Sequence, residues 1–333
     1  MIDELEEEGV GGFEFNYMIP GTACTRGQRF ISGRGNKNTR CYFTNYCDDI
    51  FMMAETAEAL QKMATKIERL FKKFGLTICC KKTESMIINH PDPENYPTSI
   101  ITIDSINIKN VEVFKYLGVK IDQKDYKTGE NEIKYRINQA NAKFRELDHL
   151  FTNHTIKLGT RLMFYNAFCR SRLCYCCSCW VITEKQRKKV ERCQVKHSRS
   201  MIKRGWSRRG GPRSMQDEIG YDFSYFYKKQ NLYHISKVEP VLNFVDSQRA
   251  KWISHVIRYD NDRMAKQSMF ELSQFSRIGR TSSILDQFLK ETRKYDLSDD
   301  TVFKSCVNRE LFSLLRDQGV IFALRQDGNS TDV

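Results

Sequence analysis

The sequence has no long apolar run and no signal for secretion. None of its 333 residues belongs to a stretch approaching the ~18 consecutive apolar residues of a membrane-spanning helix. Met1 begins an acidic segment that lacks the basic and apolar regions of a secretory signal peptide. We therefore expect an intracellular protein, in the nucleus or the cytoplasm, that is not secreted and has no membrane partner. Nothing in the sequence predicts an oligomeric state.

Acidic residues are scarce between Glu184 and Arg213, where the chain has twelve Lys or Arg and only two Glu. This segment carries a net charge of +10, out of +13 for the whole chain. A solvated helix face usually interleaves both signs, whereas a localised basic stripe is typical of a protein that binds a polyanion. We expect these cations to contact a nucleic-acid backbone: Lys185, Arg187, Lys188, Lys189, Arg192, Lys196, Arg199, Lys203 and Arg204.

Twelve cysteines occur, and the intracellular expectation favours free thiols over disulfides. The densest group lies in one apolar segment and comprises Cys174, Cys176, Cys177 and Cys179. This group lacks a second well-spaced pair of metal ligands, so we interpret it as buried small side chains rather than a zinc site. Cys193 and His197 lie one helical turn apart, but two ligands do not make a zinc site.

Two adjacent carboxylates, Asp48 and Asp49, stand between the β-favouring apolar runs 41–46 and 50–54. This pattern predicts a strand, an acidic turn and a second strand. Neighbouring residues of an extended strand point to opposite faces, so both carboxylates can face one ion only if the chain turns there. Mg²⁺ is the candidate cation, because it takes few carboxylates and keeps sites for water and phosphates. The alternative is a solvated β-turn, where Asp is common.

A helix should follow this turn. Thr56 is a suitable N-cap, Gly75 a suitable residue to end the helix, and the apolar residues between them recur at helical spacing. Beyond it the sequence predicts strands at 76–80 and 85–89, a hairpin made of 100–103 and 106–108, and a strand region at 113–121 that Gly118 interrupts. From about residue 127 the apolar spacing becomes helical.

Several of these segments resemble one family. Tyr46-Cys47-Asp48-Asp49 resembles the Y-x-D-D box of reverse transcriptases. The helix that ends at Gly75, and Lys81-Lys82-Thr83-Glu84 after it, resemble the continuation found in polymerases of non-LTR (LINE-type) retrotransposons. Phe114-Lys115-Tyr116-Leu117-Gly118 resembles the turn that closes the palm and grips the primer in that family. Segments around 171–180 and 252–258 resemble regions downstream of the polymerase.

The resemblance implies an RNA-directed DNA polymerase that uses an RNA template, a DNA primer and two Mg²⁺ ions. Asp48 and Asp49 would be catalytic and hold the metal, and Tyr46 would support the turn and approach the primer end. Lys81 or Lys82 would lie near the incoming nucleotide. The primer grip would comprise Tyr116, Leu117 and Gly118.

One feature departs from the family. A reverse transcriptase needs another Asp, on an earlier strand, to complete the metal pair, and the only Asp before Asp48 is Asp3, in a charged run. We therefore expect a polymerase fragment that is weakly active or inactive alone. The alternative is a non-catalytic remnant that binds RNA or DNA.

The expected fold class is α+β. Residues 1–40 form a Gly-rich irregular leader, and residues 41–125 a partial polymerase palm of antiparallel strands with a helix. Residues 126–215 form a helical, basic, thumb-like region, and residues 216–333 a mostly helical C-terminal region.

Overall fold

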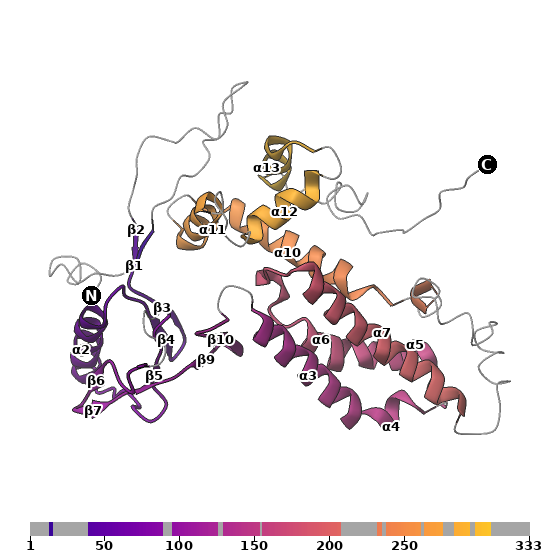
Figure 1. The fold of residues 1–333 in the computed structure, drawn as a ribbon, viewed down its shortest axis with the longest axis horizontal. Coiled ribbons are helices and arrows are strands. Elements are labelled where there is room, and N and C mark those ends of the chain that lie inside the picture. Colours follow the sequence, from indigo (N-terminus) through magenta and orange to yellow (C-terminus); the bar gives the residue numbers. More distant parts are fainter. Residues whose placement is uncertain are drawn as a thin grey trace. The chain divides into compact units, whose positions relative to one another are not determined.

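The computed structural model describes residues 13–15, 39–88, 95–125, 129–153, 155–207, 232–234, 238–260, 263–275, 283–293 and 297–307. Its contacts divide the chain into unit 1 (Met1–Gly129 and Tyr259–Asp286) and unit 2 (Glu130–Arg258 and Gln287–Val333). Helices and short, mostly antiparallel strand pairs coexist, so the fold is α+β at this level (Figure 1). The division near Gly129 lies close to the predicted end of the palm region. Residues beyond 216 contribute to both units.

All described strands belong to unit 1 and form two-stranded pairs. The antiparallel pairs are β1 (Phe13–Phe15) with β2 (Thr39–Cys41), β3 (Phe43–Tyr46) with β4 (Asp49–Met52), β6 (Thr102–Ile103) with β7 (Ile106–Asn107), and β9 (Val113–Tyr116) with β10 (Val119–Asp122). The parallel pair is β5 (Glu84–Ser85) with β8 (Lys109–Asn110).

In two of the hairpins among these pairs, both turn residues are left-handed. Asp104 and Ser105, between β6 and β7, have φ of 50° and 63°, and Leu117 and Gly118, between β9 and β10, have φ of 45° and 81°. Positive φ at both central residues is typical of a type I′ turn, whose twist matches that of the flanking strands. The predicted hairpin at 100–108 is therefore confirmed. The region 113–121 is a hairpin that turns at Gly118, not one interrupted strand.

The predicted strand at 76–80 is wrong. No described strand pairs with this segment, and the backbone N–H groups of Lys82 and Thr83 instead donate to the carbonyl of Cys79, at 3.0 and 3.1 Å. Ile78 and Cys80 nevertheless pack against the core of unit 1. Leu76 is exposed, so the alternating pattern reports burial at only these two positions, and a strand also requires a neighbour to share its hydrogen bonds.

Helix α2 (Ala57–Lys73) has the predicted ends. The Thr56 hydroxyl accepts a hydrogen bond from the N–H of Ala59 at 3.2 Å. At the other end Gly75 has φ of 71°, its N–H donates to Lys72, and the N–H of Leu76 donates to Phe71, at 3.1 and 2.9 Å. These two bonds define a Schellman motif, which satisfies carbonyls that the helix end would leave unpaired.

The buried face of α2 packs on strands from both sides of it in the sequence. Met63 packs with Tyr42, while Ala64 packs with Ile101 and Ile103. Core packing of this kind, rather than helix propensity, supplies most of the stability of a short helix.

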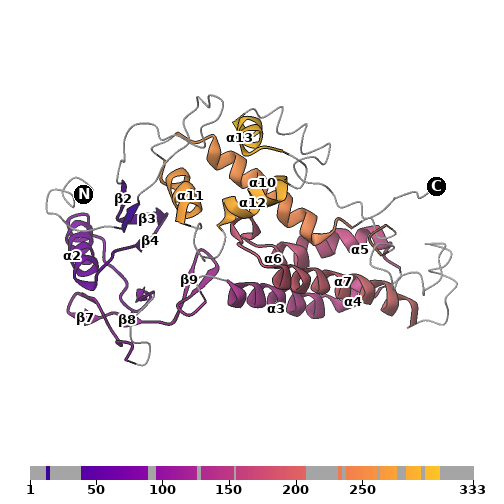
Figure 2. The same ribbon diagram turned by 45° about the horizontal axis from the view of Figure 1, so that its top comes forward.

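Unit 2 is helical (Figures 1 and 2). Its helices are α3 (Glu130–Glu146), α4 (Asp148–Phe151), α5 (Leu158–Tyr165), α6 (Ser171–Leu173), α7 (Glu184–Ser207), α10 (Val241–Ile257), most of α12 (Ile284–Arg293), and α13 (Asp299–Val307). A π-helical turn, η1 (Asn166–Arg170), joins α5 to α6, and a 3₁₀ turn, η2 (Cys177–Cys179), precedes α7. Helix α11 (Met264–Phe275) belongs to unit 1. None of the helices in the described ranges is long and apolar enough to cross a membrane.

Helices α3 and α7 run side by side in both views, and their facing side chains form the core of unit 2. Ile133 and Ala140 of α3 are buried with Val190 and Cys193 of α7, and Val245 of α10 joins the same cluster. The helical apolar spacing predicted from about residue 127 is therefore confirmed for α3 and α7.

Candidate active site and nucleic-acid surface

The two predicted catalytic carboxylates lie at the tip of the acidic hairpin, which we define as β3, β4 and the turn between them. Tyr46 pairs with Asp49 across the hairpin, so Cys47 and Asp48 are the two turn residues. Cys47 has φ of 54°, a left-handed conformation that costs a residue with a Cβ some conformational energy. The predicted strand–turn–strand is confirmed. The chain turns at Asp48, which meets the condition for both carboxylates to face one ion.

Both carboxylates are solvent-exposed. Neither has a hydrogen bond or an ion pair with any residue that the structure describes. The apolar surroundings inferred from the sequence are therefore absent at the tip, and exposure, not a buried cation, accounts for the stability of these charges. Asp48 and Asp49 remain free to take a ligand from solution.

A second hairpin, β9–β10, packs against the acidic hairpin. The ring of Phe51 lies 5.0 Å from the ring of Tyr116 and 6.0 Å from that of Phe114, measured between centroids. The hydroxyl oxygens of Thr44 and Tyr116 are 3.4 Å apart. Tyr116 of the predicted primer grip thus contacts the acidic hairpin directly. Leu117 and Gly118 form the β9–β10 turn.

The other predicted site residues are less closely connected. Tyr46 is 62% exposed, so it does not support the turn by packing. Lys81 and Lys82 are exposed in the turn that follows Cys80. Within the described residues no hydrogen bond or ion pair joins either lysine to the acidic hairpin.

A magnesium ion fits this tip only in part. Mg²⁺ is commonly bound through one or two carboxylates, and substrate phosphates and water complete its coordination. Asp48 and Asp49 could supply those carboxylates. No group of three or more His, Cys, Asp or Glu positioned to hold a metal occurs in the described part of the chain.

The exposed cations of α7 form one surface. Lys185, Lys188, Arg192 and Lys196 are all exposed and follow one another at intervals of three or four residues. At a rise of about 1.5 Å per residue, these charges stand roughly 4.5 to 6 Å apart along one side of the helix. We call these four residues the α7 basic face. Its regular spacing suits contacts with successive phosphates.

The remaining predicted cations differ from this face. Lys189 pairs with Glu130 of α3, and this bond lowers the pKa of the Glu130 carboxyl. Arg199 is half-buried. Lys203 and Arg204 lie in α7, but their side chains are outside the described part of the structure.

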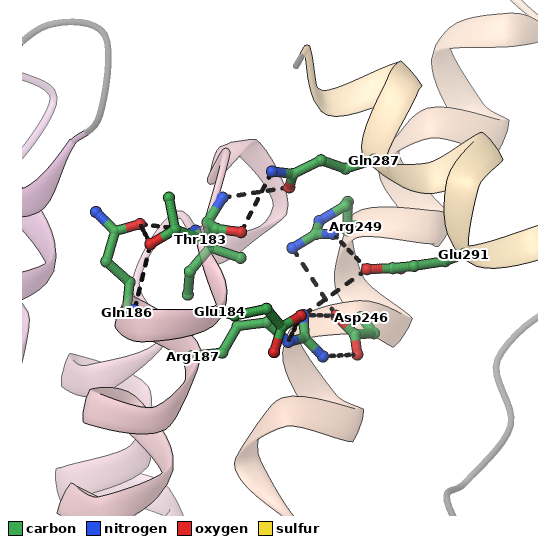
Figure 3. A network of polar contacts seen from close by, with 9 residues as sticks. Thr183, Glu184, Gln186, Arg187, Asp246, Arg249, Gln287 and Glu291 are labelled. Carbon is green, nitrogen blue, oxygen red and sulfur yellow. Dashed lines mark hydrogen bonds and ion pairs between the residues drawn. The ribbon is translucent and has the colours of Figure 1, made fainter. Parts of the chain in front are cut away.

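Arg187 is the clearest departure, because its guanidinium lies inside unit 2 (Figure 3). Its side chain is 9% exposed and donates two hydrogen bonds to the carboxylate of Asp246, at 2.7 and 2.6 Å. Burial alone would lower the pKa of Arg187, but the bonds to Asp246 raise it overall. Arg187 therefore joins α7 to α10 and is not available to a nucleic acid.

The same network extends to α12 (Figure 3). Arg249, whose side chain is 1% exposed, lies 3.3 Å from Glu291 and 3.8 Å from Asp246. The side-chain amide of Gln287 accepts from the N–H of Ile182 and donates to its carbonyl, both at 3.2 Å. These contacts link the start of α7 to residues more than fifty positions away in the sequence.

A capping box starts α7 at the edge of this network. The N–H of Thr183 donates to the side chain of Gln186 at 2.8 Å, and the N–H of Gln186 donates to the Thr183 hydroxyl at 3.3 Å. The two reciprocal bonds satisfy backbone donors that the helix start would leave unpaired. Thr-x-x-Gln is visible in the sequence, so this signal could have fixed the first residue of α7.

Cys193 and His197 belong to a buried polar cluster. The Nδ1 of His197 lies 4.0 Å from the Cys193 sulfur, and its Nε2 lies 2.9 Å from the side-chain oxygen of Asn141. Burial raises the pKa of Cys193 to about 12 and lowers that of His197 to about 4. The His197 ring also stacks on Phe144, with centroids 4.2 Å apart. A protonated thiol beside a neutral imidazole, both inaccessible, is a packing arrangement and not a nucleophile.

Comparison of the chain with models of protein families, with curated proteins and with solved structures finds no match. What the chain does is therefore inferred from its own residues.

Proposed function

We propose that this chain is part of an RNA-directed DNA polymerase of the non-LTR retrotransposon type. The observation that supports this most is the contact between the acidic hairpin and the β9–β10 hairpin. Thr44 and Tyr116 are 72 residues apart in the sequence, yet their hydroxyls meet. The resemblance assigns both segments to one polymerase palm, where a metal site and a primer grip have to be neighbours.

Each part of unit 1 has a role in this proposal. Asp48 and Asp49 hold Mg²⁺, which supplies charge stabilisation to the reacting phosphate when bound. Tyr116 braces the acidic hairpin through Phe51, and the turn at Leu117 and Gly118 holds the primer strand. An exposed lysine, Lys81 or Lys82, stabilises the charge that develops on the leaving pyrophosphate.

The α7 basic face serves the same function in unit 2. Its four cations contact the phosphates of the template–primer duplex. Such contacts hold a duplex in position but carry no sequence information, as a polymerase requires.

A second candidate function is nucleic-acid binding without catalysis. It is favoured by the contrast between a regular basic face and a tip with only two carboxylates. Asp3 is the only Asp of this chain that precedes Asp48, so this chain alone should polymerise weakly or not at all.

Primer extension on an RNA template, with Mg²⁺ or Mn²⁺, separates the two candidates when the chain is compared with its Asp48→Asn variant. Weak incorporation that the variant loses supports the polymerase proposal. Equal absence of incorporation with retained binding supports the second candidate. Absence of binding overturns both.

The binding surface is tested by the triple variant Lys188→Ala, Arg192→Ala and Lys196→Ala. Removing three phosphate contacts should reduce the slope of log affinity against log salt by about 3 for a duplex. A matched control removes three exposed cations from α2 in unit 1: Lys62, Arg69 and Lys73. Equal losses in both triple variants would show that affinity follows total charge and would refute a role for the α7 basic face.

A further inference from the structure

Two pairs of cysteines interleave around η2 in unit 2. Cys176 immediately precedes this 3₁₀ turn and Cys179 is its last residue, and the N–H of Cys179 donates to the carbonyl of Cys176 at 3.1 Å. This bond closes one turn, so it holds Cys176, which has φ of 56°, close to Cys179. The N–H of Cys177 likewise donates to the carbonyl of Cys174 at 3.2 Å, which brings the second pair together.

The two pairs differ in their access to solvent. Cys174 and Cys177 are buried in the core cluster that also contains Trp180. Cys179 is exposed and Cys176 is partly exposed. We call Cys176 and Cys179 the outer pair and Cys174 and Cys177 the inner pair. A reagent in solution can reach the outer pair and not the inner one.

The two thiols of the outer pair also differ in pKa. Interaction with the Cys176 thiol, opposed by burial and helped by the Ser178 hydroxyl 3.9 Å away, lowers the pKa of Cys179 to about 6. The same interaction raises the pKa of Cys176. One thiol of the pair is therefore an exposed nucleophile at neutral pH, and the other is a protonated neighbour.

We propose that Cys176 and Cys179 form a reversible thiol–disulfide site whose oxidant is a low-molecular-weight disulfide. The Cys179 thiolate attacks one sulfur of the reagent, a mixed disulfide forms, and one reagent thiolate leaves. Cys176 then loses its proton and attacks the Cys179 sulfur, which expels the second reagent thiolate. The two protein thiols are oxidised to one disulfide, and the reagent is reduced to two thiols.

Peptide mapping tests the product. The full chain is incubated with oxidised glutathione and then unfolded in urea, where its remaining thiols, Cys177 included, are alkylated, and chymotrypsin then cuts after Tyr175 and Trp180. The expected fragment, Cys176–Trp180, is two hydrogens lighter than its reduced form, carries one alkyl group at Cys177, and regains both hydrogens with reduced glutathione. A lasting glutathione adduct at Cys179, or prior oxidation of Cys174, would overturn the proposal.

Alkylation rates test the mechanism. At pH 6 Cys179 should react roughly ten times faster than the cysteine of an unstructured peptide, because its larger thiolate fraction outweighs its lower intrinsic nucleophilicity. Cys176→Gly should abolish this advantage without disturbing the turn, since residue 176 has φ of 56° and glycine adopts that conformation readily. Cys174→Ala should leave the rate unchanged. An unaltered rate in Cys176→Gly would show that Cys176 does not activate Cys179.

Discussion

The acidic hairpin of unit 1 and the polar network of unit 2 hold carboxylates in opposite states. Asp48 and Asp49 are exposed and have no partner among the described residues, whereas Asp246 and Glu291 face buried guanidinium groups. A buried charge must be paired to persist, so the network serves the fold. An exposed carboxylate without a partner contributes little to folding and is available to a ligand.

Helix α7 shows the same contrast between neighbouring residues. Arg187 points into unit 2 and Lys188 out of it, because consecutive residues of a helix lie about 100° apart around its axis. Charge counted along the sequence therefore overstates the surface available to a polyanion.

The largest effect is expected from Asp246→Ala. This variant removes one of the two carboxylates that the buried Arg187 and Arg249 share, the other being Glu291, and should destabilise unit 2 by about 3 kcal/mol. The three tryptophans of the chain, at 180, 206 and 252, all lie in unit 2, so their fluorescence during urea unfolding reports this unit alone. Glu184→Ala is the control. Glu184 is 77% exposed, and its carboxylate comes no closer than 4.0 Å to the Arg187 guanidinium, so it should contribute little to stability. Similar stability of both variants would show that the buried pairing of Asp246 does not stabilise unit 2.

Acid should also weaken unit 2. Burial lowers the pKa of His197 to about 4, below the ordinary value of about 6.5, so the unfolded chain binds more protons between these two values. Stability from this group is present above about pH 6.5 and decreases as the pH falls towards 4, with a loss of about 2 kcal/mol between pH 7 and pH 5. The titratable groups around the ring are Tyr165, Cys193 and the charged Lys196. His197→Gln should flatten the profile in tryptophan-monitored unfolding. An unchanged dependence of stability on pH would show that other groups cause the acid sensitivity.

The smallest effect is expected at the acidic hairpin. Cys47→Gly should stabilise it by roughly 0.5 to 1 kcal/mol, because glycine relieves the left-handed strain at a smaller cost in chain entropy. Slower hydrogen exchange of the β3–β4 amides would show this. Gly75→Ala is the opposite substitution and serves as a control. Gly75 has φ of 71° and an added Cβ meets nothing within 4 Å, so any loss of stability comes from backbone strain. Asp48→Asn should leave exchange unchanged. Faster exchange in that variant would mean that Asp48 supports the turn.

Features set by a few consecutive residues could be predicted from the sequence. Thr56 and Gly75 define both ends of α2 through bonds that span three to five residues. The acidic hairpin and the turn at Asp104 could also be predicted from the sequence, because turn residues and alternating patterns are local signals.

Features that need a distant partner could not be predicted. The segment 76–80 has strand-like alternation but no neighbouring strand to pair with. Arg187 was assigned to the surface because Asp246, which holds it inside, lies 59 residues away. Likewise, the four clustered cysteines were read as one buried group, although the turn at Cys176 divides them into a buried and an exposed pair.

The bonds between Ile182 and Gln287 have a consequence for synthesis of the chain. They span 105 residues, which take about 5 to 20 seconds to translate at ordinary elongation rates. Until Gln287 has been synthesised, the backbone groups of Ile182, just before α7, have no Gln287 side chain to bond. We therefore expect water to occupy those backbone groups first, and the nascent helical unit to wait for its own C-terminal residues before it closes.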